Sequence, residues 1–291
     1  MKPLVTLLTP AYNAMPFLDS FLESVLAQTY PNIEFIVFND GSKDNTAERL
    51  NEFAPLFAER GIVYQIISLD RNMGQAHAFN QMLPLASGDF LTWCDADDLL
   101  TPDSIEKKAD YLTQHPSVGI VRSEVDIFNV TKQTKERTIK NPSKDGTCKD
   151  LFRSLFDETE HCLAGSYMLR TGILFDAYPM RRIPESKEGQ NLQLLLPPAS
   201  MSLCGFINEP LLVYRIHSDS HSHRKRSLNE CFERNENFYS LRLQILEHCQ
   251  CDREYFKKYA CDIKEKCIRS ILYSAGREAR RKINETRNSK V

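Results

Sequence analysis

The stretch of sequence that decides the fold is Phe90–Leu100, which reads FLTWCDADDLL. Its apolar first half is typical of a buried strand, and it ends abruptly in the carboxylates Asp95, Asp97 and Asp98. Buried charge is costly, so an acidic cluster this tight at the end of a strand requires a partner. A divalent cation such as Mg²⁺ or Mn²⁺ fits best, because these hard cations take oxygen ligands. The alternative is an acidic turn that opens a helix, since carboxylates stabilise helix N-termini.

The sequence on both sides of this stretch alternates between strand-like apolar runs and amphipathic helical patterns up to about residue 130. This alternation predicts an α/β fold with a mostly parallel sheet, right-handed crossovers and helices on both faces. Because ligands of such sheets bind beyond the carboxyl ends of the strands, the acidic cluster is predicted to form one wall of a cleft there. Strands are predicted at Leu4–Thr9, Ile33–Phe38, Val63–Leu69, Phe90–Cys94 and Gly119–Phe128, and helices at Pro16–Gln28, Thr46–Arg60, Gly74–Leu85 and Pro102–His115.

The second half of the chain lacks this alternation. Long helices are predicted over Leu228–Leu246 and Tyr255–Leu272, and the tail from Arg277 onward is basic. A basic tail suits either a solvated helix end or contact with an anionic membrane surface. Between residues 130 and 222 we expect a hairpin or mobile loop at Lys132–Lys149, helices at Lys149–Phe156 and Leu192–Leu196 (the second ended by Pro197 and Pro198), a loop at Arg181–Gly189, and strands at Ala164–Leu169, Leu203–Ile207 and Leu211–Ile216.

Composition limits the class of protein. A length of 291 residues, 42% hydrophobic, is typical of one large globular domain, alone or with a helical appendage. The net charge of −2 gives no reason to expect a nucleic-acid partner. The nine cysteines show no paired spacing, which indicates reduced thiols. No apolar run is long enough to span a membrane and no signal-peptide pattern is present, so we expect a cytoplasmic protein.

Four motifs occur in order along the chain. They are Thr9-Pro10-Ala11-Tyr12-Asn13, Asn39-Asp40-Gly41-Ser42-Lys43-Asp44-Asn45-Thr46, Ala86-Ser87-Gly88-Asp89-Phe90 and Asp95-Ala96-Asp97-Asp98. Each motif is weak alone, but the ordered set resembles family 2 glycosyltransferases with the GT-A fold, well over residues 1–130 and in part over 160–222. The resemblance implies a GT-A domain at 1–222, with a nucleotide-sugar half (1–130) and an acceptor half (131–222), and a C-terminal helical region at 223–291.

The resemblance further implies a site for a UDP-sugar donor, with Mn²⁺ or Mg²⁺ as the cofactor. Asp40 matches the residue that accepts a hydrogen bond from uracil N3–H. Asp95 is expected near the ribose and Asp97 on the metal, and His217 matches a second metal ligand. His221 and His223 are interpreted as solvated loop residues. The donor-binding residues that the match implies are Thr9, Ala11, Tyr12, Asp40, Ser42, Gly74, Asn80, Asp95 and Ala96.

One departure from the family pattern affects catalysis. Inverting members carry an acidic base in a Glu-Asp pair just before a helix, and the aligned residues here are Gln190-Asn191. Neither amide takes a proton. A base must come within hydrogen-bond reach of the acceptor hydroxyl. Glu188 is therefore the candidate base, because it lies just upstream, as does Glu185.

The resemblance implies a metal-dependent inverting glycosyltransferase that moves a sugar from a UDP-sugar to an acceptor hydroxyl. The resemblance suggests a lipid-linked saccharide acceptor in the synthesis of a bacterial surface polysaccharide, at the inner face of the membrane. One alternative is a catalytically impaired sugar-nucleotide-binding or scaffold protein, which Gln190-Asn191 permits. Another is a nucleotidyltransferase, although Thr9–Pro16 lacks the glycine- and lysine-rich loop that such enzymes usually need. A phosphatase with a DxD nucleophile would carry its motif on the first strand.

Overall fold

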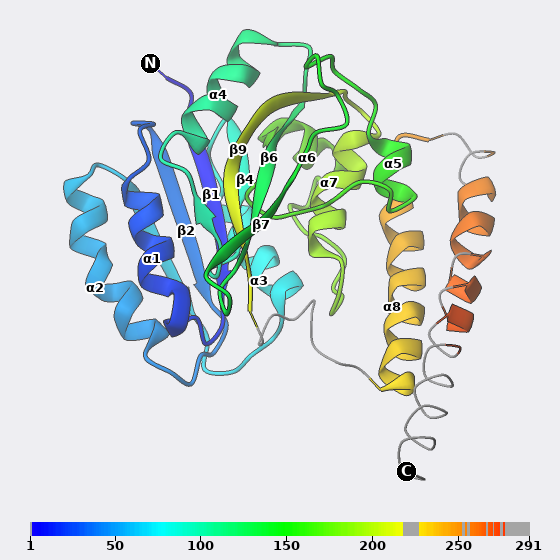
Figure 1. Cartoon of the computed structure of the whole chain (residues 1–291), viewed down its shortest axis with the longest axis horizontal. Helices are drawn as coiled ribbons and strands as arrows, with labels where there is room; N and C mark the ends of the chain where they lie inside the picture. The colour runs from blue at the N-terminus through cyan, green and yellow to red at the C-terminus, as the bar shows by residue number, and fades with distance from the viewer. Residues whose placement is uncertain are drawn as a thin grey trace.

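The computed structural model describes residues 2–217, 227–251, 254, 257–265, 267–269, 271–273 and 276 (Figure 1). Its strands are β1 (Val5–Ala11), β2 (Ile33–Asn39), β3 (Val63–Ser68), β4 (Phe90–Trp93), β5 (Leu99–Leu100), β6 (Ile120–Asn129), β7 (Thr134–Ile139), β8 (Tyr167–Arg170) and β9 (Cys204–Ile216). Its helices are α1 (Met15–Leu26), α2 (Thr46–Glu59), α3 (Gln75–Met82), α4 (Ser104–Gln114), α5 (Phe152–Phe156), α6 (Thr171–Ala177), α7 (Gln190–Ala199) and α8 (Leu228–Leu246), with a short 3-10 helix η1 (Leu83–Leu85).

The strands form one sheet in the order β3-β2-β1-β4-β8-β6-β9-β5, and β7 pairs with β6. Strands β1 to β4 are parallel to their neighbours in this set, which confirms the mostly parallel α/β sheet. Strand β8 runs antiparallel between β4 and β6, so the complete sheet is mixed. Strand β7, inside the segment Lys132–Lys149, pairs antiparallel with β6, so the predicted hairpin forms with a first strand that precedes this segment.

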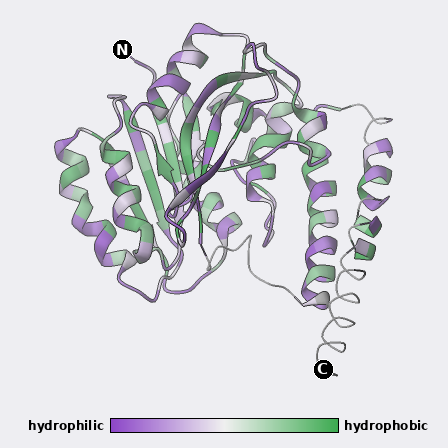
Figure 2. Ribbon diagram, viewed as in Figure 1, coloured by the Kyte–Doolittle hydropathy of each residue, from purple (hydrophilic) through white to green (hydrophobic). Residues whose placement is uncertain are grey.

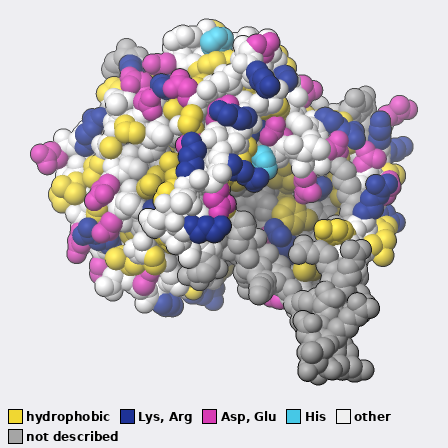
Figure 3. Space-filling view, viewed as in Figure 1, with side chains coloured by type: hydrophobic (Ala, Val, Ile, Leu, Met, Phe, Trp, Pro, Cys, Tyr) yellow, Lys and Arg dark blue, Asp and Glu magenta, His cyan; other side chains and the backbone are white. Residues whose placement is uncertain are grey.

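Helices cover both faces of the sheet, as predicted. Side chains of α1, α2 and α4 pack on one face, and those of α3, α5, α6, α7 and α8 pack on the other. Strands β1 and β2 are buried on both faces, so their apolar runs are continuous instead of alternating. Figure 2 shows the hydrophobic central strands, and on the face seen in Figure 3 acidic and basic side chains are interspersed.

Helix α8 belongs to the same hydrophobic core as α7. Its Leu241 and Ile245 are buried in that core together with Tyr259 and Ile263 from further along the chain. The two helices approach so closely that a Cβ on Gly189 would lie 2.7 Å from a methyl group of Leu241. Among the described residues, no helix is both long and apolar enough to cross a membrane. The basic tail residues from 277 onward lie outside the described residues.

The structure corrects two predictions about strands. Leu99–Leu100 is the strand β5, which pairs with β9, so the acidic turn does not open a helix directly and α4 begins only at Ser104. Segments Leu203–Ile207 and Leu211–Ile216 belong to one strand, β9, and not to two. A register shift opposite Glu124 of β6 absorbs the residues between them, so the break in the sequence pattern is a local irregularity within the strand.

The two prolines near the end of α7 do not stop this helix, contrary to the prediction. Pro197 and Pro198 lie inside it, and the helix continues to Ala199. Because Pro197 has no N–H, it leaves the carbonyl oxygen of Gln193 without its helical donor. The hydroxyl of Tyr178 donates a hydrogen bond to that oxygen (3.1 Å), which offsets the loss through a tertiary contact.

Candidate active site

Three carboxylates converge at the carboxyl end of β4. Asp95, Asp97 and Asp98 each present an oxygen within 4.8 Å of the other two. The backbone N–H of Asp98 donates to the carbonyl of Asp95 (3.2 Å), which closes the chain into a tight turn between β4 and β5. Asp98 is buried, and the other two side chains are partly buried. The predicted acidic cluster therefore forms, at the edge of the sheet where it was expected.

The surroundings of this cluster disfavour negative charge. Burial raises the pKa of Asp95 to about 7, with a further contribution from Asp97. Burial also holds the pKa of Asp98 well above its usual range. Asp98 Oδ1 accepts the backbone N–H of Arg215 (2.9 Å), whereas Oδ2 is buried with no hydrogen-bond partner among the described residues. A divalent cation would stabilise the ionised carboxylates, so this oxygen-rich donor set fits Mg²⁺ or Mn²⁺.

His217, just after β9, lies beside the cluster. Its Nε2 is 3.0 Å from Oδ2 of Asp97, and its ring packs on Phe17 of α1 with the ring centroids 4.4 Å apart. Carboxylate oxygens are preferred ligands of Mn²⁺, and neutral imidazole is a common ligand of divalent transition metals. The structure thus brings together the two residues expected to hold the metal. Residues 218–226, which include His221 and His223, lie outside the described residues.

Asp40, at the end of β2, holds the loop that follows β3. It is buried, and its two carboxylate oxygens accept the backbone N–H groups of Met73 and Gly74, each at 2.7 Å. The next residue, Gly41, has φ +69°, and a Cβ there would lie 2.3 Å from the carbonyl carbon of Arg71. A carboxylate has lone pairs beyond these two bonds, so Asp40 retains capacity to accept from a ligand.

The residues at the end of β1 lie beside the end of β2, at the same edge of the sheet as Asp40. Thr9 and Ala11 are buried, and the hydroxyl of Thr9 has no hydrogen-bond partner among the described residues. The Tyr12 side chain is 49% exposed, which leaves its ring accessible to a ligand. Ser42 Oγ accepts the backbone N–H of Asn13 (3.0 Å), a residue with φ +51°. Ser42 thereby ties the loop after β2 to the loop after β1.

Asn80, which was expected to line the donor site, makes both of its side-chain contacts with protein. Its Nδ2 donates to the carbonyl of Ile183 (3.0 Å), and its Oδ1 accepts the N–H of the same residue (2.8 Å). These bonds fasten the loop before α7 to α3. Gly74 lies at the start of α3 with φ +93°, and a Cβ there would meet no atom within 4 Å.

The amides at the usual position of the base are structural in this chain. Asn191 Oδ1 accepts the indole N–H of the buried Trp93 (2.7 Å), and its Nδ2 donates to the carbonyl of Cys162 (2.9 Å). Gln190 is buried and donates to the carbonyl of Ser186 (3.2 Å). Both side chains therefore join the start of α7 to neighbouring segments.

The two upstream carboxylates have different surroundings. Glu188 is largely covered, and its Oε2 lies 3.1 Å from Nε of Arg234 on α8. Glu185 is exposed, with one oxygen 3.9 Å from Nδ1 of His77 on α3. Glu188 is thus the carboxylate that the fold holds in place next to α7, and Arg234 is a partner that the sequence pattern did not indicate.

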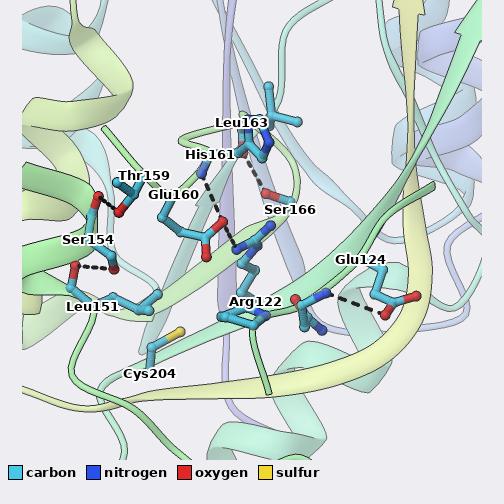
Figure 4. A network of polar contacts seen from close by, with 12 residues as sticks. Arg122, Glu124, Leu151, Ser154, Thr159, Glu160, His161, Leu163, Ser166 and Cys204 are labelled. Atoms are coloured by element: carbon cyan, nitrogen blue, oxygen red, sulfur yellow. Dashed lines mark hydrogen bonds and ion pairs between the residues drawn. The ribbon is translucent and has the colours of Figure 1, made fainter. Parts of the chain in front are cut away.

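The loop that supplies the Cys162 carbonyl is anchored by a buried ion pair (Figure 4). Arg122 of β6 is buried and pairs with Glu160, and its guanidinium carbon lies 5.7 Å from the ring centre of Tyr167. The hydroxyl of Tyr167 donates to the carbonyl of His161 (2.7 Å). This network fixes the loop on the side of the sheet that carries α7.

The chain belongs to glycosyl transferase family 2, because the model of that family matches residues 6–174. The matched range contains the acidic cluster and Asp40. Glu188, Asn191 and His217 lie beyond it.

Several curated proteins are similar to this chain. TuaG of Bacillus subtilis, named for teichuronic acid biosynthesis, is 34% identical over 113 residues, which are 39% of this chain and 43% of TuaG. An uncharacterised glycosyltransferase of Haemophilus influenzae is 37% identical over 43% of this chain and 38% of its own length. This chain therefore spans less than half the length of these two relatives. EpsH of Bacillus subtilis, named as a glycosyltransferase, is 25% identical over 88% of this chain and 73% of its own length.

Solved structures show the fold. TarS of S. aureus in complex with UDP-GlcNAc has a TM-score of 0.68 and 17% identity, covering 89% of this chain and 71% of TarS. The mannosyltransferase PcManGT of Pyrobaculum calidifontis, solved with GDP-Man and Mn²⁺, has a TM-score of 0.60 and 17% identity, covering 96% of this chain and 76% of its own. The chain has the GT-A fold that the resemblance implied.

Proposed function

We propose that this protein is a metal-dependent inverting glycosyltransferase that moves a sugar from a UDP-sugar to an acceptor hydroxyl. The observation that carries this proposal is the convergence of three carboxylates at the end of β4, with His217 Nε2 3.0 Å from Asp97. Family membership and the fold of TarS, solved with UDP-GlcNAc, support a nucleotide-sugar donor. PcManGT, solved with GDP-Man and Mn²⁺, supports a cation and makes a GDP-sugar the second candidate donor.

Asp97 and His217 are the residues we assign to the metal. A bound Mn²⁺ or Mg²⁺ would neutralise charge on the departing diphosphate. Asp95 is assigned to the ribose, and Ala96 is small enough to let the donor approach. On the protein side, Asp98 holds the acidic turn through its bond to the backbone of Arg215. Residues 95–98 are consecutive in the turn between β4 and β5, and Arg215 and His217 reach this turn from the end of β9, which supports a single site.

The nucleoside is assigned to the edge formed by β1, β2 and the start of α3. Asp40 is the proposed acceptor for uracil N3–H, which favours uracil over bases without that donor. The exposed ring of Tyr12 is positioned to pack on a ligand at this edge. The remaining residues proposed to bind the donor are Thr9, Ala11, Ser42, Gly74 and Asn80.

The experiment that tests this proposal is a thermal-shift screen of nucleotides and UDP-sugars with and without Mn²⁺. A ligand that binds only the folded state raises the melting temperature by mass action. We expect UDP-sugars to stabilise the protein, Mn²⁺ to increase the shift, and Asp97→Ala to abolish the increase. A larger shift with GDP- or ADP-sugars would reassign the donor. Binding without release of UDP in the presence of a true acceptor would favour a scaffold protein.

Glu188 is the proposed base that deprotonates the acceptor. It is the carboxylate that the structure holds next to α7, where Gln190 and Asn191 are engaged with the protein. We expect Glu188→Gln to lower kcat about 100-fold or more, as loss of a general base does, with unchanged UDP-sugar binding. Glu185→Gln is the matched control on the same loop and is expected to keep its activity. Equal activity of Glu188→Gln and wild type would place the base elsewhere.

The acceptor is proposed to be a lipid-linked saccharide in the synthesis of a bacterial surface polysaccharide. TuaG, named for teichuronic acid biosynthesis, supports this class. We propose residues 1–222 as the GT-A domain, with a nucleotide-sugar half (1–130) and an acceptor half (131–222), followed by a C-terminal helical region (223–291). A cytoplasmic location fits, with peripheral contact of the basic C-terminus at the inner face of the membrane.

A further inference from the structure

Arg215 is a nearly buried cation that fastens the acidic turn to the rest of the protein. It lies in β9 and is 8% exposed. Burying a guanidinium is costly unless its N–H groups are bonded. Its Nε donates to the carbonyl of Asp97, and Nη2 donates to the carbonyl of Asp98 (3.3 Å). Toward α1, Nη1 donates to Ser20 Oγ (2.7 Å) and Nη2 donates to the carbonyl of Phe17 (3.4 Å).

The same residue supports the imidazole beside the cluster. The guanidinium carbon of Arg215 lies 4.9 Å from the ring centre of Phe17, and that ring packs on His217 at 4.4 Å. The backbone N–H of Arg215 donates to Asp98 Oδ1 (2.9 Å). Three separate segments, the turn after β4, the start of α1 and the end of β9, are therefore joined through one side chain.

We propose that Arg215 is a positioning residue that holds Asp97 and His217 in the arrangement a divalent cation requires. This inference rests on the metal site of the proposed function. A guanidinium has no lone pair to offer, so Arg215 acts through the groups it holds and not as a ligand. Its positive charge also offsets part of the negative charge of the carboxylates in the turn that it holds. Residues that orient metal ligands in this way typically contribute about 10- to 100-fold in metal affinity.

If Arg215 had a purely structural role, its substitution would lower thermal stability without changing the affinity for Mn²⁺. The chain offers a comparable arginine away from the site as a control. Arg170, at the end of β8, also bonds backbone carbonyls, those of Val118 (2.9 Å) and Leu112 (2.6 Å). It also stacks on a phenylalanine, with its guanidinium carbon 5.4 Å from the ring centre of Phe90. Phe90 is at the amino end of β4, whereas the acidic cluster is at the carboxyl end, so Arg170 supports the fold away from the site.

The test compares Arg215→Lys and Arg215→Gln with Arg170→Lys in the full chain. The affinity for Mn²⁺ in the presence of saturating UDP is measured by water-proton relaxation, and thermal melts confirm folding. Both Arg215 variants are expected to bind Mn²⁺ about tenfold or more weakly, with metal-free UDP binding unchanged. The Arg170 variant is expected to lose thermal stability only. Lysine keeps the charge but not the forked geometry, so a full rescue by Arg215→Lys would assign the effect to charge and overturn a geometric role.

The outcomes separate this inference from the proposed function. If Asp97→Ala weakens Mn²⁺ binding and the folded Arg215 variants do not, only the role of Arg215 is wrong. If wild type binds no Mn²⁺, the proposed metal site and this inference both fail. Should the Arg215 variants not fold, Ser20→Ala and Phe17→Leu remove one support each while Arg215 remains. Wild-type Mn²⁺ affinity in both of these would then overturn the inference, and weaker binding would support it.

Discussion

Lys108 of α4 is a fully buried amine, close to Cys94 at the end of β4. Its ammonium donates to the carbonyl of Gly165. Gly165 has φ +78°, and a Cβ there would lie 3.0 Å from Sγ of Cys94. Burial lowers the pKa of Lys108 to about 8. The fold therefore includes a lysine whose charged form is disfavoured, and this has a measurable effect on stability as a function of pH.

We expect the free energy of unfolding of wild type to rise with pH relative to Lys108→Met. The folded lysine releases its proton near pH 8, whereas an unfolded lysine holds it to about pH 10.4. Between these values the unfolded state binds more protons, so increasing pH favours folding. The gain is about 2 kcal/mol between pH 7.5 and 10, measured by urea denaturation at both values. Lys132→Met, at an exposed site, is the control, and parallel pH profiles for wild type and Lys108→Met would contradict the expectation.

The sequence predicts the candidate site residues better than it predicts the contacts that hold them in position. The acidic cluster and His217 were expected from motif and resemblance, and the structure brings them together. Arg215 was visible as a charged residue in an otherwise apolar run, but its bonds to Asp97 and Ser20 join positions far apart in sequence. Periodicity has no information about such contacts, since they form only when α1 and β9 meet.

At the scale of whole elements, local patterns located the helices and strands well but misjudged their ends. The prolines of α7 were expected to stop the helix, because a proline removes a helical hydrogen bond. Tyr178, about twenty residues upstream, supplies the missing donor. Likewise β5 is too short for any pattern to reveal it, and it exists because β9 offers it an antiparallel partner. Each miss is a tertiary contact that overrides a local preference.

Helix α8 shows how an element outside the family match shapes the site. Its Arg234 lies 3.1 Å from Glu188, on the loop before α7. Two turns later, Arg242 pairs with Glu158, on the loop that bonds Asn191. One helix thus contacts both loops that flank the start of α7. The position of the proposed base consequently depends on a segment that was expected, from the sequence, to be a C-terminal appendage.

In the whole molecule, the order of the strands makes the two proposed halves interdependent. Strand β6 ends the alternating pattern of the first half, yet both of its neighbours within the main sheet, β8 and β9, come from the second half. Strand β4, which leads into the acidic cluster, also pairs with β8. The alternation in the sequence predicted the parallel strands but not the position of β8 between β4 and β6, because the pairing of distant strands leaves no local signal.

We therefore expect a fragment of residues 1–130 not to fold on its own. Without β8 and β9 it leaves β6 unpaired and exposes one edge of β4, which removes the hydrogen bonds and the packing that bury these strands. Circular dichroism during thermal melting should show no cooperative transition for this fragment. A fragment of residues 2–217 contains all nine strands that the structure describes and is the control, and it should melt cooperatively below the full chain because it lacks α8. Cooperative melting of fragment 1–130, or UDP binding by it, would show instead that the nucleotide-sugar half is an independent unit.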